Sequence, residues 1–225
     1  MKDLSINIYY ILDMKKFDYE SIYDEVEDFY DGLAAVKRNG KWGFVNKQDE
    51  EVIPCKYDDA GRFAEGFARV RFGGKWGFVN KQGEEVIPCK YEDVDYYFFT
   101  GLAKVKLGGK WGCVNKQGEE VIPCKYEEVG CFYDGLADVK LGGKWGFVSK
   151  QGEEVIPCKY EEVGCFSDGL ADVKLGGKWG FVNKPGEEVI QCKYDNAWRF
   201  SEGFASVKHG GKWGRVNAKG EEFWD

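Results

Sequence analysis

The sequence predicts an all-β protein built from tandem repeats of about 34 residues, each folded as a three-stranded antiparallel meander. Three observations predict this class: a Trp-Gly pair recurs at a nearly constant interval, short runs alternate between apolar and polar residues, and turn-forming pairs separate those runs. The composition agrees, because a chain with 16% aromatic residues and 31 glycines against 5 prolines suits short strands joined by tight turns.

The repeat is defined by the tryptophan of a Gly-Lys-Trp-Gly string. Successive copies of this tryptophan lie 34, 35, 34, 34 and 34 residues apart. The one extra residue falls between Tyr91 and Gly101, so we predict a connecting loop there, since loops tolerate insertions. The six tryptophans are Trp42, Trp76, Trp111, Trp145, Trp179 and Trp213.

Each repeat contains three runs with the two-residue period of a β-strand, as the copy over residues 101–129 illustrates. Its first run alternates apolar residues with lysine over residues 103–107, and its second places Trp111 and Cys113 on one face. Its third run alternates in the same way over residues 122–126. Each run is about six residues long, a usual length for a strand.

The turns between the runs predict antiparallel hairpins. Gly-Gly stands between the first two strands, or Asn39-Gly40 in the first copy, and both pairs accept the two positive φ angles of a type I′ turn. Gln-Gly stands between the second and third strands, or Pro185-Gly186 in the fifth copy. Proline excludes type I′ there, so we predict a type II turn with glycine, or Asp49 in the first copy, in the left-handed region.

The Trp-Gly pair is predicted to be a packing device. A three-stranded sheet of short strands buries too little apolar surface to be stable alone, so we expect one face to pack on the next repeat. A buried tryptophan covers about 200 Å², which at about 25 cal/mol/Å² stabilises a junction by up to about 5 kcal/mol. The glycine that follows would let a neighbouring backbone approach closely. We therefore assign the six tryptophans to the structural core.

The ends of the sequence favour an open superhelical array of stacked repeats, with a closed six-bladed propeller-like ring as the alternative. Residues 19–26 align with the third strand of a repeat, and residues 6–12 align with the second strand but lack Trp-Gly. We therefore predict a degenerate N-terminal capping repeat over residues 1–26. Six repeats, the last of them truncated, then form one repeat domain over residues 27–225.

Charge and hydropathy restrict the partners. A net charge of −7 argues against unaided binding of nucleic acid, which needs a dense field of lysine and arginine. No apolar run approaches the roughly 20 residues that span a bilayer, so no membrane partner is expected. The N-terminus lacks the basic start, long apolar centre and small-residue cleavage site of a secretory signal, so a cytoplasmic location is expected.

No catalytic, cofactor-binding or metal-binding residue is predicted, and the protein is expected not to be an enzyme. His209 is the one histidine, and no Cys-x-x-Cys pair exists, so a zinc site or a histidine-based relay lacks its usual ligands. Cys131 and Cys165 are interpreted as structural thiols. The carboxylates recur beside lysine in every copy, so no two of them stand apart as a glycosidase pair would.

The string "GKWGFVNKQGEEVIPCKYEDV", followed by "FTGLAKVK", resembles the WG-repeat (KWG-repeat) family, found mostly in bacterial proteins. The resemblance covers about residues 19–225 and recurs six times. It implies a repetitive β architecture of variable copy number, and it implies no common activity or catalytic residue set. Gln191 in place of proline and Arg215 in place of phenylalanine depart from the pattern.

The predicted function is a non-enzymatic scaffold for protein–protein interaction, because near-identical copies suit multivalent binding better than a single catalytic site. Its alternative is a carbohydrate or cell-envelope binding module, which the aromatic content favours. Neither the ligand nor the oligomeric state is predicted. The candidate partner-binding residues are contact-prone types in the variable loops: Arg62, Tyr96, Tyr97, Trp198 and Arg199.

Overall fold

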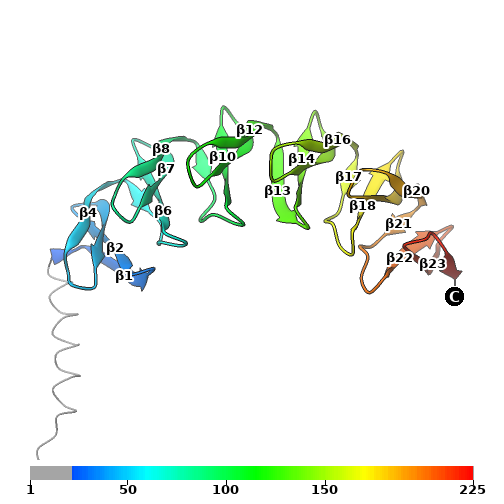
Figure 1. The fold of residues 1–225 in the computed structure, drawn as a ribbon, viewed down its shortest axis with the longest axis horizontal. Coiled ribbons are helices and arrows are strands. Elements are labelled where there is room, and N and C mark those ends of the chain that lie inside the picture. The colour runs from blue at the N-terminus through cyan, green and yellow to red at the C-terminus, as the bar shows by residue number, and fades with distance from the viewer. Residues whose placement is uncertain (1–21, 225) are drawn as a thin grey trace, which may run out of the picture. The chain divides into compact units, whose positions relative to one another are not determined.

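The computed structural model describes residues 22–224, which form six antiparallel sheets of four strands each (Figure 1). The all-β tandem architecture predicted from the sequence is confirmed. The first three sheets contain β1 (Glu25–Tyr30), β2 (Leu33–Arg38), β3 (Lys41–Asn46) and β4 (Glu51–Tyr57); β5 (Asp59–Ala60), β6 (Phe67–Phe72), β7 (Lys75–Asn80) and β8 (Glu85–Tyr91); and β9 (Asp93–Val94), β10 (Leu102–Leu107), β11 (Lys110–Asn115) and β12 (Glu120–Tyr126). The last three contain β13 (Glu128–Tyr133), β14 (Leu136–Leu141), β15 (Lys144–Ser149) and β16 (Glu154–Tyr160); β17 (Glu162–Val163), β18 (Leu170–Leu175), β19 (Lys178–Asn183) and β20 (Glu188–Tyr194); and β21 (Asn196–Ala197), β22 (Phe204–His209), β23 (Lys212–Asn217) and β24 (Glu222–Trp224).

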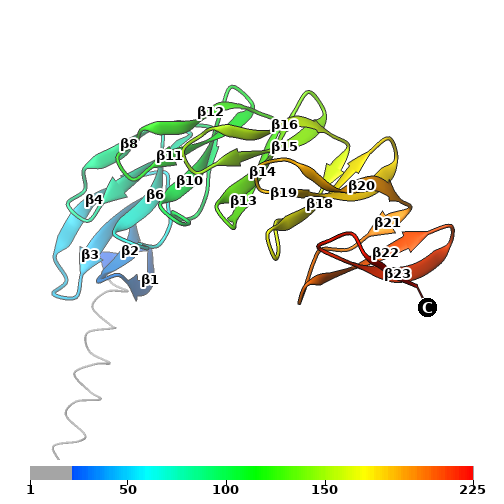
Figure 2. The same ribbon diagram turned by 45° about the vertical axis from the view of Figure 1, so that its right-hand side comes forward.

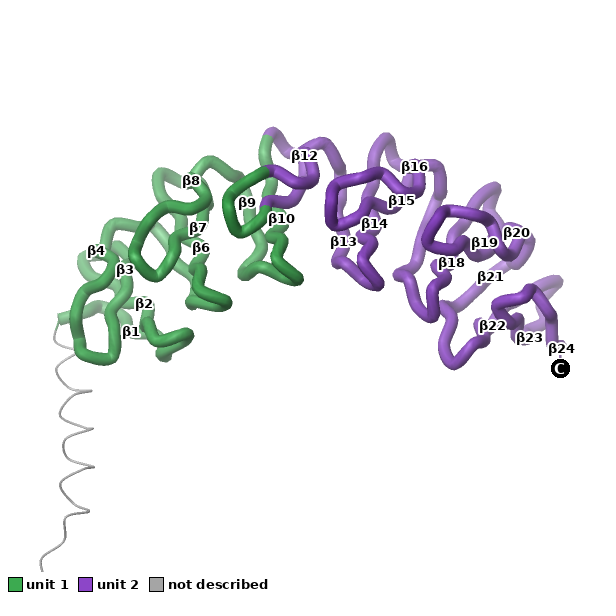
Figure 3. The backbone as a smooth tube through the Cα atoms, in the orientation of Figure 1, with its two compact units in different colours: residues 1–107, 115–119 green, residues 108–114, 120–225 purple. Residues whose placement is uncertain are grey.

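The chain divides into two compact units (Figure 3). One comprises residues 1–107 and 115–119, and the other comprises residues 108–114 and 120–225. The first two sheets belong to the first unit and the last three to the second, since the division falls within the third sheet. Within each sheet the strands follow chain order, as β22 and β23 of the sixth sheet illustrate (Figure 2).

The prediction of three strands per repeat is wrong by one strand. In four of the sheets the additional first strand is only two residues long, as in β5, which is too short to show alternation. It begins one residue after the previous sheet ends, because Asp58 alone separates β4 from β5. A tight turn with positive φ at Glu65 (52°) and Gly66 (87°) leads from this strand towards β6.

The predicted boundary at residue 26 lies inside β1, where Glu25 pairs with Lys37 and Val26 pairs with Val36. The proposed alignment of residues 6–12, and most of that of residues 19–26, lies outside the described residues. At the other end, β24 has three residues where the corresponding strands of the other sheets have seven.

The type I′ turn is confirmed between the second and third strands. Asn39 and Gly40 have φ angles of 52° and 74°, and the flanking Arg38 and Lys41 pair directly. The predicted type II turn in the next hairpin is wrong. Positive φ falls on the fourth residue of that turn, Asp49 in the first sheet, whose amide donates to the carbonyl of Asn46. This pattern is that of a type I turn followed by a G1 bulge.

In the first five sheets, the glycine after the tryptophan accommodates a bulge of the neighbouring strand. Trp42 pairs with Tyr57 and Phe44 pairs with Ile53, so three residues of β4 face Gly43 alone. A Cβ atom on Gly43 would lie 2.5 Å from the carbonyl oxygen of Ile53. The predicted close approach is therefore present, and the approaching backbone belongs to the same sheet. Proline suits the first position of this bulge, Pro54 in β4, because it has no N–H to leave unpaired.

The core lies between consecutive sheets of a unit. In the first unit, one face of the first sheet packs against the opposite face of the second, and the Phe63 ring contacts the Phe44 ring edge-on at 4.8 Å between centroids. The same arrangement recurs in the second unit, where Phe166 contacts Phe147 at 4.9 Å. The first cluster contains Leu33, Ala35, Phe44, Ile53, Tyr57, Phe63, Ala68, Val70 and Val79.

The tryptophans lie at the margin of this core. Trp42 is half-buried and Trp213 is 43% exposed, whereas the tyrosine opposite Trp42, Tyr57, is fully buried. The Trp42 ring is covered by the cross-strand Lys37, whose Nζ lies 5.4 Å from the ring centroid. The same cross-strand cover recurs in four further pairs, Arg71 with Trp76, Lys140 with Trp145, Lys174 with Trp179 and Lys208 with Trp213.

Candidate functional site

One pair of positions varies among the sheets although its surroundings are constant, and of the six pairs those of the fourth and fifth sheets are the same. The second strand of each sheet carries a buried alanine and a buried valine on either side of one changing residue, such as Arg69 between Ala68 and Val70. The partner position lies two residues before a phenylalanine at the end of the first strand or just after it, or three residues before it in the third sheet. We call these residues the variable pairs. From the first to the sixth sheet they are Glu27/Ala35, Gly61/Arg69, Asp95/Lys104, Gly130/Asp138, Gly164/Asp172 and Trp198/Ser206.

The backbone holds the two members of a variable pair together. The amide of Gly61 donates to the carbonyl of Arg69 at 2.9 Å, and the amide of Trp198 donates to the carbonyl of Ser206 at 2.9 Å. The side chains compensate in size: a Cβ on Gly61 would lie 2.9 Å from Cγ of Arg69, whereas the large Trp198 faces the small Ser206. Five of the six pairs therefore combine a larger side chain with a small one, and the pair of the third sheet, Asp95 and Lys104, forms an ion pair instead.

The variable pairs of the fourth and fifth sheets carry carboxylates. Asp172 is 8% exposed, its Oδ1 has no hydrogen-bond partner among the described residues, and burial raises its pKa. Burial, with the carboxylates of Asp138 and Asp172 nearby, also raises the pKa of the Cys165 thiol. In the third sheet burial raises the pKa of Asp95.

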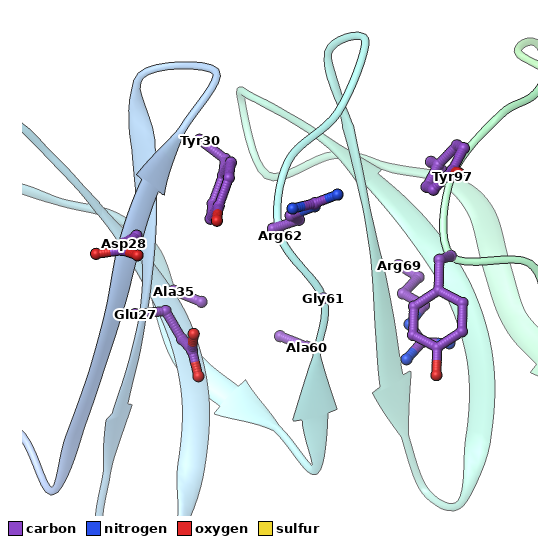
Figure 4. A pocket seen from close by; sticks show the side chains of 10 residues that line it. Glu27, Asp28, Tyr30, Ala35, Ala60, Gly61, Arg62, Arg69 and Tyr97 are labelled. Carbon is purple, nitrogen blue, oxygen red and sulfur yellow. The ribbon is translucent and has the colours of Figure 1, made fainter.

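A cavity of about 400 Å³ lies at the variable pairs of the first two sheets, within the first unit (Figure 4). Small residues separate its charged walls, because Gly61 and Ala60 lie between Glu27 and Arg69 in the close-up view (Figure 4). The residues that line it are Glu27, Asp28, Tyr30, Ala35, Ala60, Gly61, Arg62, Arg69, Tyr96 and Tyr97.

Arg69 is held in this cavity by aromatic rings. Its guanidinium carbon lies 4.6 Å from the ring centroid of Trp76 and 3.5 Å from that of Tyr96. Its Nε is buried without a hydrogen-bond partner among the described residues, and no carboxylate of that part of the chain forms an ion pair with it. Such contacts fix the plane of the guanidinium and leave its edge able to donate hydrogen bonds.

The other charged side chains of the cavity are also unpaired within the described part of the chain. The Arg62 guanidinium lies 4.7 Å from the ring centroid of Tyr30, and the two side chains stand near one another in Figure 4. Neither Glu27 nor Asp28 forms an ion pair with Arg62 or Arg69 within residues 22–224, although all four line the same cavity. The two acidic residues thus lie on β1, whereas Arg69 lies on β6 and Arg62 lies in the segment between β5 and β6.

A second cavity, of about 560 Å³, lies at the variable pair of the sixth sheet in the second unit. Trp198 is 65% exposed beside it, and the Arg215 guanidinium lies 5.5 Å from the ring centroid of Phe204. Its lining residues are Trp198, Arg199, Ser201, Glu202, Phe204, Ala205, Ser206 and Arg215.

The structure places the loop residues singled out in the sequence at these two cavities: Arg62, Tyr96 and Tyr97 at the first, and Trp198 and Arg199 at the second. Sequence reasoning missed Arg69, because its strand position was interpreted as a solvated lysine-type site. A signal existed. This position takes Ala, Arg, Lys, Asp, Asp and Ser in the six copies, while the alanine and valine beside it do not change.

Other candidates offer no site. The described residues contain no group of three or more histidine, cysteine or acidic side chains placed to hold a metal ion. The eight cysteines are free thiols, and burial raises the pKa of both Cys89 and Cys192 to about 11. His209 ends a strand instead of lying in the turn, with Nδ1 3.2 Å from the carbonyl of Lys193. No helix of the described residues is long and apolar enough to cross a membrane.

Comparison with known proteins gives a family match along the repeats. The model described as "WG containing repeat" matches six segments, and no curated protein matches the chain. The matched segments are residues 19–42, 42–76, 76–111, 111–145, 145–179 and 179–213.

Likenesses to solved structures are weak. Hsv2p of Kluyveromyces lactis is 9% identical with a TM-score of 0.38, over 86% of this chain and 74% of that one. A eukaryotic initiation factor is 11% identical with a TM-score of 0.49, over 89% of this chain and 65% of that one. At such TM-scores neither likeness bears on function.

Proposed function

The chain belongs to the WG containing repeat family, and on this premise we propose that it is a non-enzymatic scaffold that binds a partner protein through its variable pairs and the loops beside them. The observation that carries the proposal is the gathering of exposed aromatic and arginine side chains at cavities next to variable pairs. Tyr96 is 69% exposed and Trp198 is 65% exposed. Tyrosine, tryptophan and arginine are the residue types that contribute most to binding at protein interfaces.

The constant frame around the variable pairs supports a binding role. The flanking alanine and valine are fully buried in every sheet, so the residues of the variable pair change between copies while these two core positions stay the same. Exposure of large apolar side chains such as Tyr97 and Trp198 to water is unfavourable in free energy. Their presence at loop positions therefore suits contact with another molecule. The proposal keeps the cytoplasmic location expected from the sequence and includes neither nucleic acid nor membrane as a partner.

A second candidate is a carbohydrate or cell-envelope binding module. The exposed Trp198 beside the second cavity favours it, because an indole ring offers a flat apolar surface on which a sugar ring can stack. The candidate differs from the first in its ligand and uses the same surface.

Site-specific photo-crosslinking tests the proposal. The photoreactive amino acid p-benzoyl-phenylalanine replaces Tyr97 or Trp198 in the cell that makes the protein, and Leu141 serves as a matched control. Leu141 is also exposed and apolar, but it lies where Leu107 and Leu175 stand in neighbouring copies. We expect one protein to crosslink at Tyr97 or Trp198 and not at Leu141.

Two outcomes contradict the proposal. The same crosslinks at all three positions would mean that contact is unspecific. No protein crosslink at either loop, together with glycan-array binding that Trp198→Ala abolishes, would replace the scaffold with the carbohydrate-binding candidate.

A further inference from the structure

We propose that the cavity of the first unit binds a segment of the partner that carries a basic and an acidic side chain close together. The acidic side chain would bind Arg69 and the basic one would bind Glu27. This inference rests on the proposed function and adds the chemistry of the ligand.

Arg69 is the residue that binds the carboxylate of the ligand, as a hydrogen-bond donor. Its guanidinium is fixed between Trp76 and Tyr96, so little side-chain freedom remains to be lost when a ligand binds. Its guanidinium forms no ion pair with a carboxylate of the described residues, so its charge is available to a ligand in the cavity. Arginine binds carboxylates through two parallel hydrogen bonds, and no neutral ligand group can supply both acceptors with charge.

The carboxylates of the cavity select against a ligand with negative charge alone. Glu27 and Asp28 lie on β1 and line the same space, so a dianionic group such as a phosphate would meet like charges there. A ligand with positive charge alone would meet Arg62 and Arg69 instead. A ligand that carries both charges satisfies both walls.

Only small side chains line the cavity between Glu27 and Arg69. Ala35, Ala60 and Gly61 line it with small side chains or none, and Gly61 lies between Glu27 and Arg69 in Figure 4. Alternate residues of an extended segment point to the same side, so a basic and an acidic residue separated by one residue could reach both walls.

The contrast with Arg71 sharpens the assignment. Arg71 lies on the same strand, and its guanidinium carbon also lies near the Trp76 ring, 5.4 Å from the centroid. Unlike Arg69, it has a carboxylate partner, since its Nη2 lies 3.6 Å from Oδ2 of Asp59, and it does not line the cavity. Of these two arginines of β6, the one facing the cavity is the one without an ion pair in the described residues.

Three peptides of equal length test the inference by NMR titration: acetyl-Gly-Lys-Gly-Glu-Gly-amide, acetyl-Gly-Gln-Gly-Glu-Gly-amide and acetyl-Gly-Lys-Gly-Gln-Gly-amide. The backbone amide of Gly61 reports binding in every variant, because it donates a hydrogen bond to the backbone carbonyl of residue 69, which the substitutions do not remove. We expect replacement of the peptide's Glu to weaken binding about tenfold, as a charge-assisted hydrogen bond would. Replacement of its Lys should weaken binding about two- to fivefold, since Glu27 is exposed.

Variants assign each charge to its residue. Arg69→Gln should abolish the preference for Glu over Gln in the peptide, and Glu27→Gln should abolish the preference for Lys over Gln. Arg71→Lys is the matched control and should leave both preferences intact. Arg69→Lys keeps the charge without the two-pronged geometry and should retain only part of the Glu preference. Thermal unfolding of each variant verifies that the cavity is still folded.

The outcomes separate this inference from the proposed function. Equal binding of the three peptides, or preferences unchanged in folded Arg69→Gln and Arg69→Lys, would overturn the inference even if crosslinking identifies a partner. The expected charge preferences would support the inference even if crosslinking at Tyr97 captures no protein and the scaffold function fails.

Discussion

The glycine after each tryptophan allows a quantitative test of the packing inside a sheet, and Gly146→Ala is the most direct variant. Gly146 faces the bulge of β16, where an added Cβ would lie 2.4 Å from the carbonyl oxygen of Ile156 and 2.7 Å from the amide nitrogen of Cys158. Gly146 does not have a positive φ, so its backbone conformation itself suits alanine. Any loss of stability therefore comes from the close approach of the two strands.

The structure gives the size of the effect. Strands β15 and β16 would have to separate by at least about 0.6 Å to bring the 2.4 Å contact to the 3.0 Å at which real Cβ contacts begin. This movement weakens the backbone pairing on both sides of the bulge, at about 1 kcal/mol for each hydrogen bond. It also disturbs the buried Phe147 and Ile156, and strain of this kind typically costs 1–3 kcal/mol. With one hydrogen bond weakened on each side of the bulge, we expect a total loss of about 3–5 kcal/mol.

Gly142→Ala is the matched control in the adjacent hairpin. Gly142 has a φ of 61° and no atom within 4 Å of a built Cβ, so alanine there costs only the left-handed conformation, about 1–2 kcal/mol. Urea unfolding followed by tryptophan fluorescence, with hydrogen exchange of β15 and β16, measures both variants. An equal or smaller loss for Gly146→Ala would refute the reasoning, because the glycine would then be required for its flexibility.

Two further predictions concern side-chain hydrogen bonds, one of the repeated tyrosine hydroxyl group and one of the Glu222 carboxylate in β24. Tyr57 and Tyr194 occupy the same repeat position, but the Tyr57 hydroxyl is buried without a partner among the described residues, whereas that of Tyr194 donates to Glu222 at 2.7 Å. Tyr57→Phe should therefore leave the free energy of unfolding unchanged or raise it, and Tyr194→Phe should lower it by about 1.5 kcal/mol in the same urea experiment; equal effects would contradict this. Hydrogen bonds from Lys193 and then Tyr194 lower the pKa of Glu222 from 4.5 to about 2, so its contribution is complete above pH 4.5 and is lost as the pH falls towards 2. Glu222→Gln should lose about 1–2 kcal/mol at pH 7, allowing for partial exposure, and a difference from the parent that persists unchanged at pH 2 would contradict this.

The sequence predicts the frame of the protein well because the frame depends on local chemistry. The spacing of Trp42 and its equivalents establishes the repeat, and Asn39-Gly40 establishes a type I′ turn, since few residue pairs accept its two positive φ angles. The additional first strand, such as β5, could not be predicted in this way because two residues cannot show alternation. Its pairing with the next strand depends on the Glu65-Gly66 turn.

The roles of tryptophan and tyrosine could not be distinguished from the sequence. Both are large aromatic residues with one polar group, and hydrophobicity alone ranks tryptophan first as a core residue. In the structure Tyr57 fills the space between two sheets, while Trp42 lies at the margin under Lys37. The Lys37 ammonium lies over the ring and forms an ion pair with Glu25, an arrangement that requires the cross-strand pairing to be known.

The loop residues of the candidate site could be predicted from the sequence, whereas its strand residue was missed. Arg62, Tyr96 and Trp198 stand out as exposed residue types in loops, and composition is enough to identify them. Arg69 lies in a strand, and only the pairing of β5 with β6 brings it beside Gly61, eight residues earlier. Comparison of the six copies at that single strand position would have revealed it, because variation within an otherwise constant strand indicates a surface role.

The size compensation within variable pairs explains where cavities form. When the loop member is glycine, the side chain of the strand member occupies the space that a Cβ would take, as Arg69 does beside Gly61 and Asp172 does beside Gly164. Asp172 is short and remains buried, so it fills that space, whereas the longer Arg69 extends to the aromatic rings around it and leaves a cavity at its edge. Among the pairs with a glycine, the length of the strand side chain therefore distinguishes a filled surface, as at Asp172, from one bordered by a cavity, as at Arg69.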